Sequence, residues 1–232
     1  VFKIIAAFLV IAIHTSPLAG FNAGADLLLT RIAARLAVPF FFMVTGHFIL
    51  SEYMYGQKRP APILRYLKKI LIMYIISVLL YIPVGIYAGH YRKLKLLSIM
   101  RMLFFDGSFY HLWYFPALII GVLITCIMLR FFRPRVCTVI AVVLYFFGLF
   151  GDSYWGLTCR ITGISSIYEL GFKIFTYTRN GLFFAPLFLI MGAWLGRKGD
   201  GGNTKKNLIA FAASFFLMAA ESFILHLYGL PR

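Results

Sequence analysis

The sequence predicts an all-α membrane protein, a polytopic bundle of transmembrane helices. Of its 232 residues, 62% are hydrophobic and only 13% are charged, which is more apolar surface than a soluble domain of this size buries. The apolar residues come in long runs, and the first of these, residues 4–25, contains no Asp, Glu, Lys or Arg. Runs of that length are typical of membrane-spanning helices. We therefore expect a single transmembrane domain over residues 1–232, incomplete at both ends.

Seven segments are long and apolar enough to be expected as spans: residues 1–18, 26–50, 70–89, 111–129, 136–151, 180–196 and 207–230. Pro39 is expected to kink or begin the apolar part of the second span, because proline lacks a backbone N–H donor. Residues 51–69 and 90–110 are expected to be loops. Residues 152–179 are more polar and are expected to form an interfacial or re-entrant excursion.

The net charge of +16 does not indicate nucleic-acid binding, because the basic residues lie between the apolar runs. This is the positive-inside pattern, which orients a membrane protein and brings its basic residues to anionic lipid. The basic stretches at 58–69, 130–135 and 197–206, with Lys3, hold more Lys and Arg than the opposite side. We therefore expect them and the N-terminus on the cytoplasmic side, with membrane lipid as a partner. No Walker loop, zinc spacing or Gly-x-Ser-x-Gly elbow occurs, and no metal is expected.

The first span carries the most informative pair of residues, Lys3 and His14. They are eleven positions apart, which returns to nearly the same helix face about 16 Å along the axis. Ionisable groups near mid-bilayer are costly and usually line a cavity or pathway. His14 is therefore a site hypothesis, with a histidine hydrogen-bonded between packed helices as the alternative. In the second span, Arg31 and Arg35 are i and i+4 and are expected to share a face.

Four motifs, in order along the chain, resemble those of the acyltransferase-3 family of multi-span membrane proteins. Lys3-x10-His14 resembles the family's Arg-x10-His. Residues 35–48, Arg-Leu-Ala-Val-Pro-Phe-Phe-Phe-Met-Val-Thr-Gly-His-Phe, resemble its Arg-x-x-Val-Pro-x-Phe-Phe-x-x-Ser-Gly stretch. Residues 111–118, His-Leu-Trp-Tyr-Phe-Pro-Ala-Leu, resemble His-x-Trp-Phe-x-x-Ala, and residues 179–186 resemble a later Arg-Asn-Gly segment. The resemblance covers essentially the whole chain.

Within that family, residues 12–18 and 221–226 resemble the membrane half of vancomycin-resistance serine racemases. In those proteins a module of this kind precedes a cytoplasmic racemase domain that uses pyridoxal phosphate. The resemblance implies a multi-pass protein of the bacterial cytoplasmic membrane. It also implies that about seven of roughly ten spans lie in this sequence, with the others beyond Arg232, and that a fused racemase domain is a possible partner.

The resemblance implies acyl transfer across the bilayer. Cytoplasmic acyl-CoA, most simply acetyl-CoA, would donate its acyl group to a hydroxyl of an extracytoplasmic acceptor such as a cell-wall carbohydrate. His14 would be the general base that deprotonates this hydroxyl, and Glu221, an acid inside the last expected span, would orient or charge-balance it. Lys3 stands where the family has arginine, so the charge is kept but the bidentate fork is lost.

Two further sets of residues are assigned to binding. The phosphates of acyl-CoA are expected to meet a set of cations: Lys3, Arg31, Arg35, Arg65, Lys68 and Lys69. The extracytoplasmic acceptor is expected to meet His111, Trp113 and Arg179. Each set has a structural alternative, namely ion pairs with acids, a topology-setting charge cluster, or an interfacial aromatic belt.

Two other functions stay open at this point. The chain could be the L-serine uptake module of a membrane-bound serine racemase, in which case Lys3 or Arg35 would meet the carboxylate of the amino acid. It could also be a degenerate membrane anchor, although the retained ionisable residues argue against this.

Overall fold

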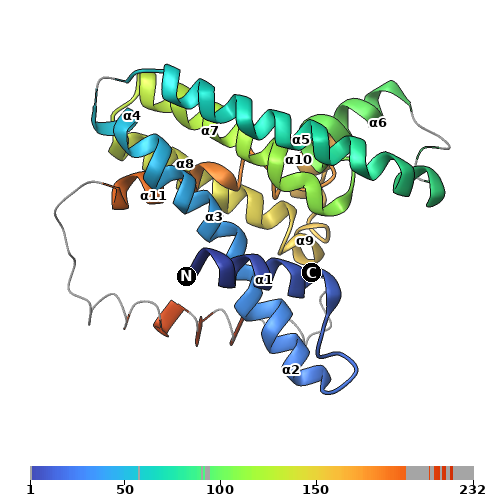
Figure 1. Ribbon diagram of the computed structural model, residues 1–232. Helices are drawn as coiled ribbons and strands as arrows, with labels where there is room; N and C mark the ends of the chain where they lie inside the picture. The colour runs from blue at the N-terminus through green and yellow to red at the C-terminus, as the bar shows by residue number, and fades with distance from the viewer. Residues whose placement is uncertain are drawn as a thin grey trace. The chain divides into compact units, whose positions relative to one another are not determined.

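The computed structural model describes residues 2–56, 58–89, 91, 95–196, 209, 212–214, 216, 217, 220 and 221, with only the backbone of Tyr110. Every secondary-structure element in this described part is helical (Figure 1). The all-α prediction is therefore confirmed. The chain forms two compact units, residues 1–41 with 197–231 and residues 42–196 with Arg232.

The first unit begins with α1 (Phe2–Thr15), which is shorter than the expected span to residue 18. The helix ends where it does because Ser16 has a φ of 43° and precedes Pro17, a position that disfavours helical backbone. Four further elements follow: α2 (Ala23–Leu27), the π-helix η1 (Leu28–Ala33), the 3₁₀-helix η2 (Ala34–Leu36) and α3 (Ala37–Thr45). Pro39 lies in the first turn of α3, as expected of a proline that begins a helical segment.

The second unit begins within α3 and continues through the π-helix η3 (Gly46–Leu50) and α4 (Ser51–Tyr55). Next comes α5 (Ala61–Tyr87), followed by α6 (Leu96–Arg101) and the π-helix η4 (Met102–Asp106). Two sequence predictions are wrong here. The basic stretch before residue 70 is not all loop, because prolines at 60 and 62 start α5 early by fixing the backbone of its first turn. The 90–110 loop contains helix from Leu96 onward.

The remaining elements of this unit are the 3₁₀-helix η5 (Tyr110–Trp113), α7 (Tyr114–Phe131), α8 (Pro134–Gly151), α9 (Trp155–Thr158), α10 (Thr162–Gly171) and α11 (Ala185–Leu195). Four helical runs in the described residues are long and apolar enough to cross a membrane: Ala23–Tyr55, Ala61–Tyr87, His111–Phe131 and Pro134–Gly151. The expected first and sixth spans appear as shorter apolar helices, Phe2–Thr15 and Ala185–Leu195. Most of the expected seventh span lies outside the described residues.

Helices α5 and α7 lie side by side and run antiparallel (Figure 1). At one end, Lys58 Nζ, just before α5, donates a hydrogen bond of 2.6 Å to Leu129 O in the last turn of α7. At the other end, the ring of Tyr81 in α5 lies 4.7 Å from the ring of His111, just before α7. The two ends are about 27 Å apart along α7, close to the thickness of a bilayer's hydrocarbon core.

Helix α11 is held against η3, α7 and α8 by small residues at the contacts. A Cβ at Gly192 would overlap the carbonyl oxygen of Met43, and a Cβ at Gly46 would overlap that of Leu189. Glycine at both positions therefore lets the backbones of α11 and the α3–η3 segment touch. Close contact of this kind drives helix association in lipid, where apolar side chains gain nothing by leaving the acyl chains.

This contact predicts that Gly192→Ala destabilises the second unit by about 1–3 kcal/mol, the usual cost of overpacking, because the backbone of Met43 cannot move aside as a side chain would. The measurement is thermal unfolding of the full-length protein in detergent micelles, followed by circular dichroism. Gly163→Ala, in α10, is the matched control because a Cβ there meets nothing within 4 Å. Equal melting temperatures for the two variants would contradict the packing described here.

Candidate functional site

The eleven side chains predicted from sequence fall into three groups. Five lie in the first unit: Lys3, His14, Arg31, Arg35 and Glu221. Three lie on α5, and three lie around the start of α7 and the loop before α11. Each group is therefore described by itself.

In the first unit, α1 packs against η1 and η2, the elements that carry Arg31 and Arg35. Buried alanines allow the approach, because Ala6 and Ala34 are both fully inaccessible to solvent. The ring of Phe2 meets the ring of Phe40 at 4.6 Å and holds the start of α1 in place. Four of the five predicted side chains in this unit thus come from α1 and the two elements that it contacts, η1 and η2.

Lys3 and His14 are both within α1, so the single helix face expected for them is confirmed. Both side chains are exposed and both make contacts. His14 lies one residue before the end of the helix, rather than midway along a longer one, since the backbone turns at Ser16. The pair therefore places one cation and one imidazole along one accessible stripe.

Arg31 and Arg35 do not lie on regular α-helix. Arg31 is in the π-helix η1, and Arg35 is in the 3₁₀-helix η2. The turn width therefore changes between the two residues, and their spacing is not that of a regular α-helix. Arg31 is exposed, whereas Arg35 is half-buried and has contacts. Irregular turns inside a helix are frequent at functional sites.

Two acidic residues of this unit, Asp26 and Glu221, lie in different surroundings. The carboxylate of Asp26 is buried, and its Oδ1 accepts a hydrogen bond of 3.0 Å from the backbone N–H of Leu18. It thereby closes the turn that follows α1. Glu221 lies in a helical stretch of the described residues, is half-buried and has contacts.

On α5, the cations Arg65, Lys68 and Lys69 are exposed in the first turns of the helix. They are spaced i, i+3 and i+4 and so share a face. They lie at the end of the α5–α7 pair that the Lys58–Leu129 hydrogen bond closes.

The third group lies at the opposite end of the α5–α7 pair. The guanidinium carbon of Arg179 is 5.3 Å from the centre of the Trp113 ring, a cation–π contact. Arg179 Nε also lies 3.8 Å from Asp152 Oδ2, so an acid at the end of α8 helps to hold it. His111, two residues before Trp113, contacts the rings of Tyr81 and Phe109.

Buried amide and hydroxyl groups fix the loop that carries Arg179. Asn180 is 1% exposed; its Oδ1 accepts hydrogen bonds from Leu182 N and Phe183 N, and its Nδ2 donates to Tyr177 O at 2.9 Å. Thr178 Oγ1 donates to Gly148 O at 2.6 Å. The backbone on both sides of Arg179 is therefore anchored, while the Trp113 ring and the Asp152 carboxylate contact its guanidinium.

A second acid, Asp106, ties the same loop to the end of η4. Its carboxylate accepts hydrogen bonds from the backbone N–H and the hydroxyl of Thr176 and lies 3.7 Å from Arg101 Nε. Tyr168, outside the spanning helices, donates to Phe147 O at 2.8 Å. Burial raises its pKa, so the phenol keeps its proton at neutral pH.

Sequence reasoning missed Asp152, Asp106 and Asn180. The chain has only seven Asp and Glu residues, so an acid directly after an apolar run, as at Asp152, is a signal that could have singled out that residue. Asn180 belongs to the Arg-Asn-Gly motif, but no sequence pattern indicates its partners. In the described part of the chain, no three His, Cys, Asp or Glu side chains gather as metal ligands would.

Comparison with known proteins identifies the family. The sequence model of the acyltransferase-3 family, which is described as an acyltransferase domain, matches residues 1–231. The chain belongs to the acyltransferase-3 family. No solved structure matches the chain, so the family assignment rests on the sequence.

Three curated relatives are similar to this acyltransferase-3 chain along its length. Two amino-acid racemases of Enterococcus faecalis are 39% and 37% identical to it, over 100% and 97% of the chain. A serine/alanine racemase of Enterococcus gallinarum is 34% identical over 100% of the chain. The chain spans only 32% to 33% of the length of these proteins. The resemblance to membrane-bound racemases seen in the sequence is thereby confirmed.

The anchoring of the Arg179 loop predicts that Asn180→Ala lowers the free energy of unfolding by about 1–3 kcal/mol, because the buried N–H of Phe183 and the half-buried N–H of Leu182 lose their acceptor. Chemical unfolding of the purified protein in micelles measures this loss. Ser166→Ala, on the exposed side of α10, should change stability by less than about 0.5 kcal/mol. The anchoring role is refuted if Asn180→Ala is as stable as the Ser166 variant.

Proposed function

We propose that this chain is the membrane module of an acyltransferase that moves an acyl group from cytoplasmic acyl-CoA to a hydroxyl of an extracytoplasmic acceptor. The observation that carries the proposal is the family match over residues 1–231. The proposed acyl group is acetyl, and the proposed acceptor is a carbohydrate of the cell wall. The proposed location is a bacterial cytoplasmic membrane, with the N-terminus on the cytoplasmic side.

The arrangement of the second unit supports a reaction that works across a bilayer. The end of α5 that carries Arg65, Lys68 and Lys69 is basic and exposed, which suits the phosphates of acyl-CoA. The end that carries Trp113 and Arg179 offers an aromatic face beside a guanidinium and the Asp152 carboxylate. Such a surface suits a hydroxylated or anionic acceptor, and it lies about one hydrocarbon thickness from the basic end.

In the proposed reaction, His14 is the general base. Its neutral imidazole takes the proton of the acceptor hydroxyl while the hydroxyl oxygen attacks the thioester carbonyl. The carbon–sulfur bond then breaks, the CoA thiolate leaves, and the proton passes to its sulfur. The products are an acyl ester and free CoA. Lys3 and Arg35 would hold anionic groups of the donor, and Glu221 would charge-balance the imidazolium.

A second function is favoured by the names of the relatives, which are racemases about three times as long as this chain. In this alternative the chain takes up L-serine and supplies a fused racemase domain. Lys3 or Arg35 would then bind the carboxylate of the amino acid, and His14 would contact the substrate or couple proton movement. No acyl donor would be needed.

The acyltransferase proposal predicts that His14→Ala lowers the rate of acyl transfer by about 10²- to 10⁴-fold, the usual contribution of a general base. The assay follows labelled acetyl groups from acetyl-CoA to product in membranes that contain the full-length protein. His47→Ala is the matched control, because His47 is also an exposed histidine on an apolar helix but is not assigned a role. An unchanged rate in the His14 variant would refute its role as base.

A further inference from the structure

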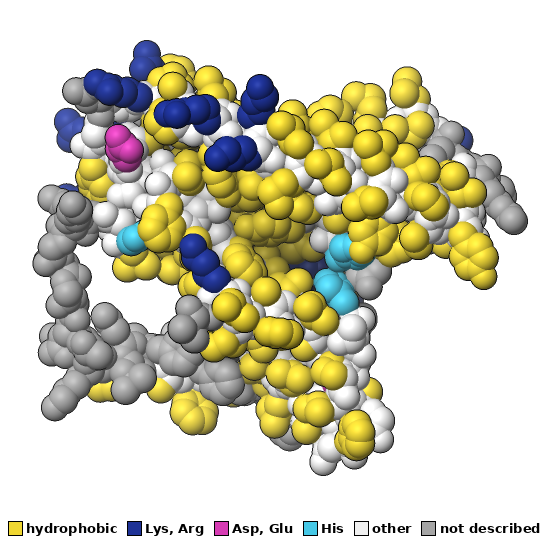
Figure 2. Space-filling model, viewed as in Figure 1, with side chains coloured by type: hydrophobic (Ala, Val, Ile, Leu, Met, Phe, Trp, Pro, Cys, Tyr) yellow, Lys and Arg dark blue, Asp and Glu magenta, His cyan; other side chains and the backbone are white. Residues whose placement is uncertain are grey.

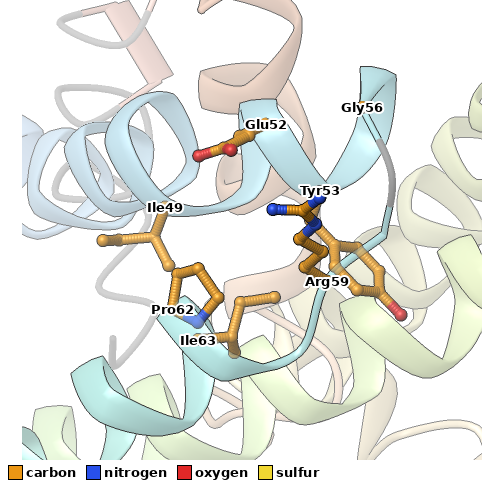
Figure 3. A pocket seen from close by; sticks show the side chains of 7 residues that line it. All are labelled: Ile49, Glu52, Tyr53, Gly56, Arg59, Pro62 and Ile63. Atoms are coloured by element: carbon orange, nitrogen blue, oxygen red, sulfur yellow. The ribbon is translucent and has the colours of Figure 1, made fainter.

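A pocket lies where α4 ends and α5 begins (Figure 3). Its volume is about 300 Å³, and six side chains form most of its lining: Ile49, Glu52, Tyr53, Arg59, Pro62 and Ile63. Figure 3 shows the Glu52 carboxylate and the Arg59 guanidinium on one side of the opening, with Pro62 and Ile63 across from Glu52. The pocket therefore has one polar side and one apolar side.

The two charged groups of the pocket, the Glu52 carboxylate and the Arg59 guanidinium, do not form an ion pair with each other. Neither Glu52 nor Arg59 forms an ion pair with any residue that the structure describes, although both line the same cavity. A guanidinium seeks an anion with oxygen acceptors, and a carboxylate seeks hydrogen-bond donors. A ligand that satisfies both carries an anionic group and, a short distance away, hydroxyl or amine groups.

The surroundings of the pocket favour an anion overall. Lys58, Arg65, Lys68 and Lys69 lie next to it along the chain. Figure 2 shows Lys and Arg side chains gathered at the end of the second unit that carries α4 and the start of α5, with an acidic side chain among them. Beyond this basic end, the visible surface over α5 is almost wholly hydrophobic.

An exposed apolar stripe leads away from the pocket along α5. Counting from Pro62 in the pocket lining, Lys69 and then Met73, Ile76 and Leu80 lie within about 40° of the same helix face. The three apolar side chains are 52% to 70% exposed. Only 11% of the apolar window of α5 is buried inside the protein, so this stripe is open to lipid in the second unit.

We propose that this pocket binds the headgroup of an anionic phospholipid whose headgroup carries hydroxyl groups. The phosphate lies on Arg59, and the headgroup hydroxyls donate to the Glu52 carboxylate. The glycerol backbone meets Pro62 and Ile63, and an acyl chain follows the stripe along α5. A soluble anion such as a coenzyme would leave that stripe unused. The proposal does not depend on acyl transfer.

The test measures lipid binding to the detergent-solubilised, delipidated full-length protein by native mass spectrometry. Phosphatidylglycerol is compared with phosphatidylmethanol, which has the same charge but no headgroup hydroxyls, and with zwitterionic phosphatidylcholine. We expect phosphatidylglycerol to bind most tightly and phosphatidylcholine least. Equal binding of all three lipids to the wild type overturns the proposal whatever the variants do.

Two variants locate the binding. Arg59→Gln should weaken phosphatidylglycerol binding about tenfold or more, since a charge-assisted contact to phosphate is lost. Glu52→Ala should abolish the preference for phosphatidylglycerol over phosphatidylmethanol. Arg133→Gln is the matched control, because it removes an exposed charge outside the pocket, and should change binding by less than about twofold.

Two results would overturn the assignment. If Arg133→Gln weakens binding as much as Arg59→Gln, the lipid contact is diffuse and the pocket is not its site. If acetyl-CoA displaces phosphatidylglycerol from the wild type and its own binding requires Arg59, the pocket belongs to the acyl donor. Circular dichroism shows whether each variant is folded. If a variant is not folded, the comparison of the three lipids on the wild type decides whether the proposal stands.

Discussion

The close contact between α11 and the α3–η3 segment is the constraint on which the second unit depends. Gly192 and Gly46 remove the side chains that would keep the two backbones apart. In lipid, helices do not associate by hiding apolar surface, so this close approach supplies the attraction. Once α11 is fixed, the loop before it is fixed too, because Asn180 and Thr178 bind that loop to its own backbone and to α8. The backbone that carries Arg179 is thereby anchored near Trp113 and Asp152.

The second unit has two chemically different ends. The antiparallel α5–α7 pair places exposed cations at one end, and a tryptophan, an arginine and a carboxylate at the other. The separation is about that of the two surfaces of the bilayer core. An acyltransferase that works between compartments needs a donor side and an acceptor side at such a distance. The proposed transfer across the bilayer rests on the family match and is consistent with this separation.

Much of the fold could be predicted from the sequence, because long apolar runs have few alternatives to helix in a membrane. The helices His111–Phe131 and Pro134–Gly151 lie where they were expected. Helix α5 begins before Arg65, Lys68 and Lys69, basic residues that predict a loop, because arginine and lysine are good helix formers after a proline. The irregular turns of η1 and η2 could not be predicted, because hydrophobic periodicity does not distinguish π and 3₁₀ turns from α-helix.

The candidate site was less predictable than the fold. Sequence motifs singled out Trp113 and Arg179, and the structure brings these two side chains together. The acid that holds Arg179, Asp152, was not predicted, because pairing between residues distant in sequence is decided by tertiary structure. The assignment of His14 and Glu221 to catalysis stays a prediction.

The most direct test of acyl transfer uses the full-length protein in two kinds of sealed vesicle: inverted vesicles given labelled acetyl-CoA on the outside, and right-side-out vesicles given labelled L-serine on the outside. We expect the acetyl label to leave CoA and to be recovered on a product inside the inverted vesicles, and serine not to accumulate beyond the level in vesicles that lack the protein. Serine accumulation with all acetyl label still on CoA would contradict this expectation and would make this domain an uptake module built on an acyltransferase fold.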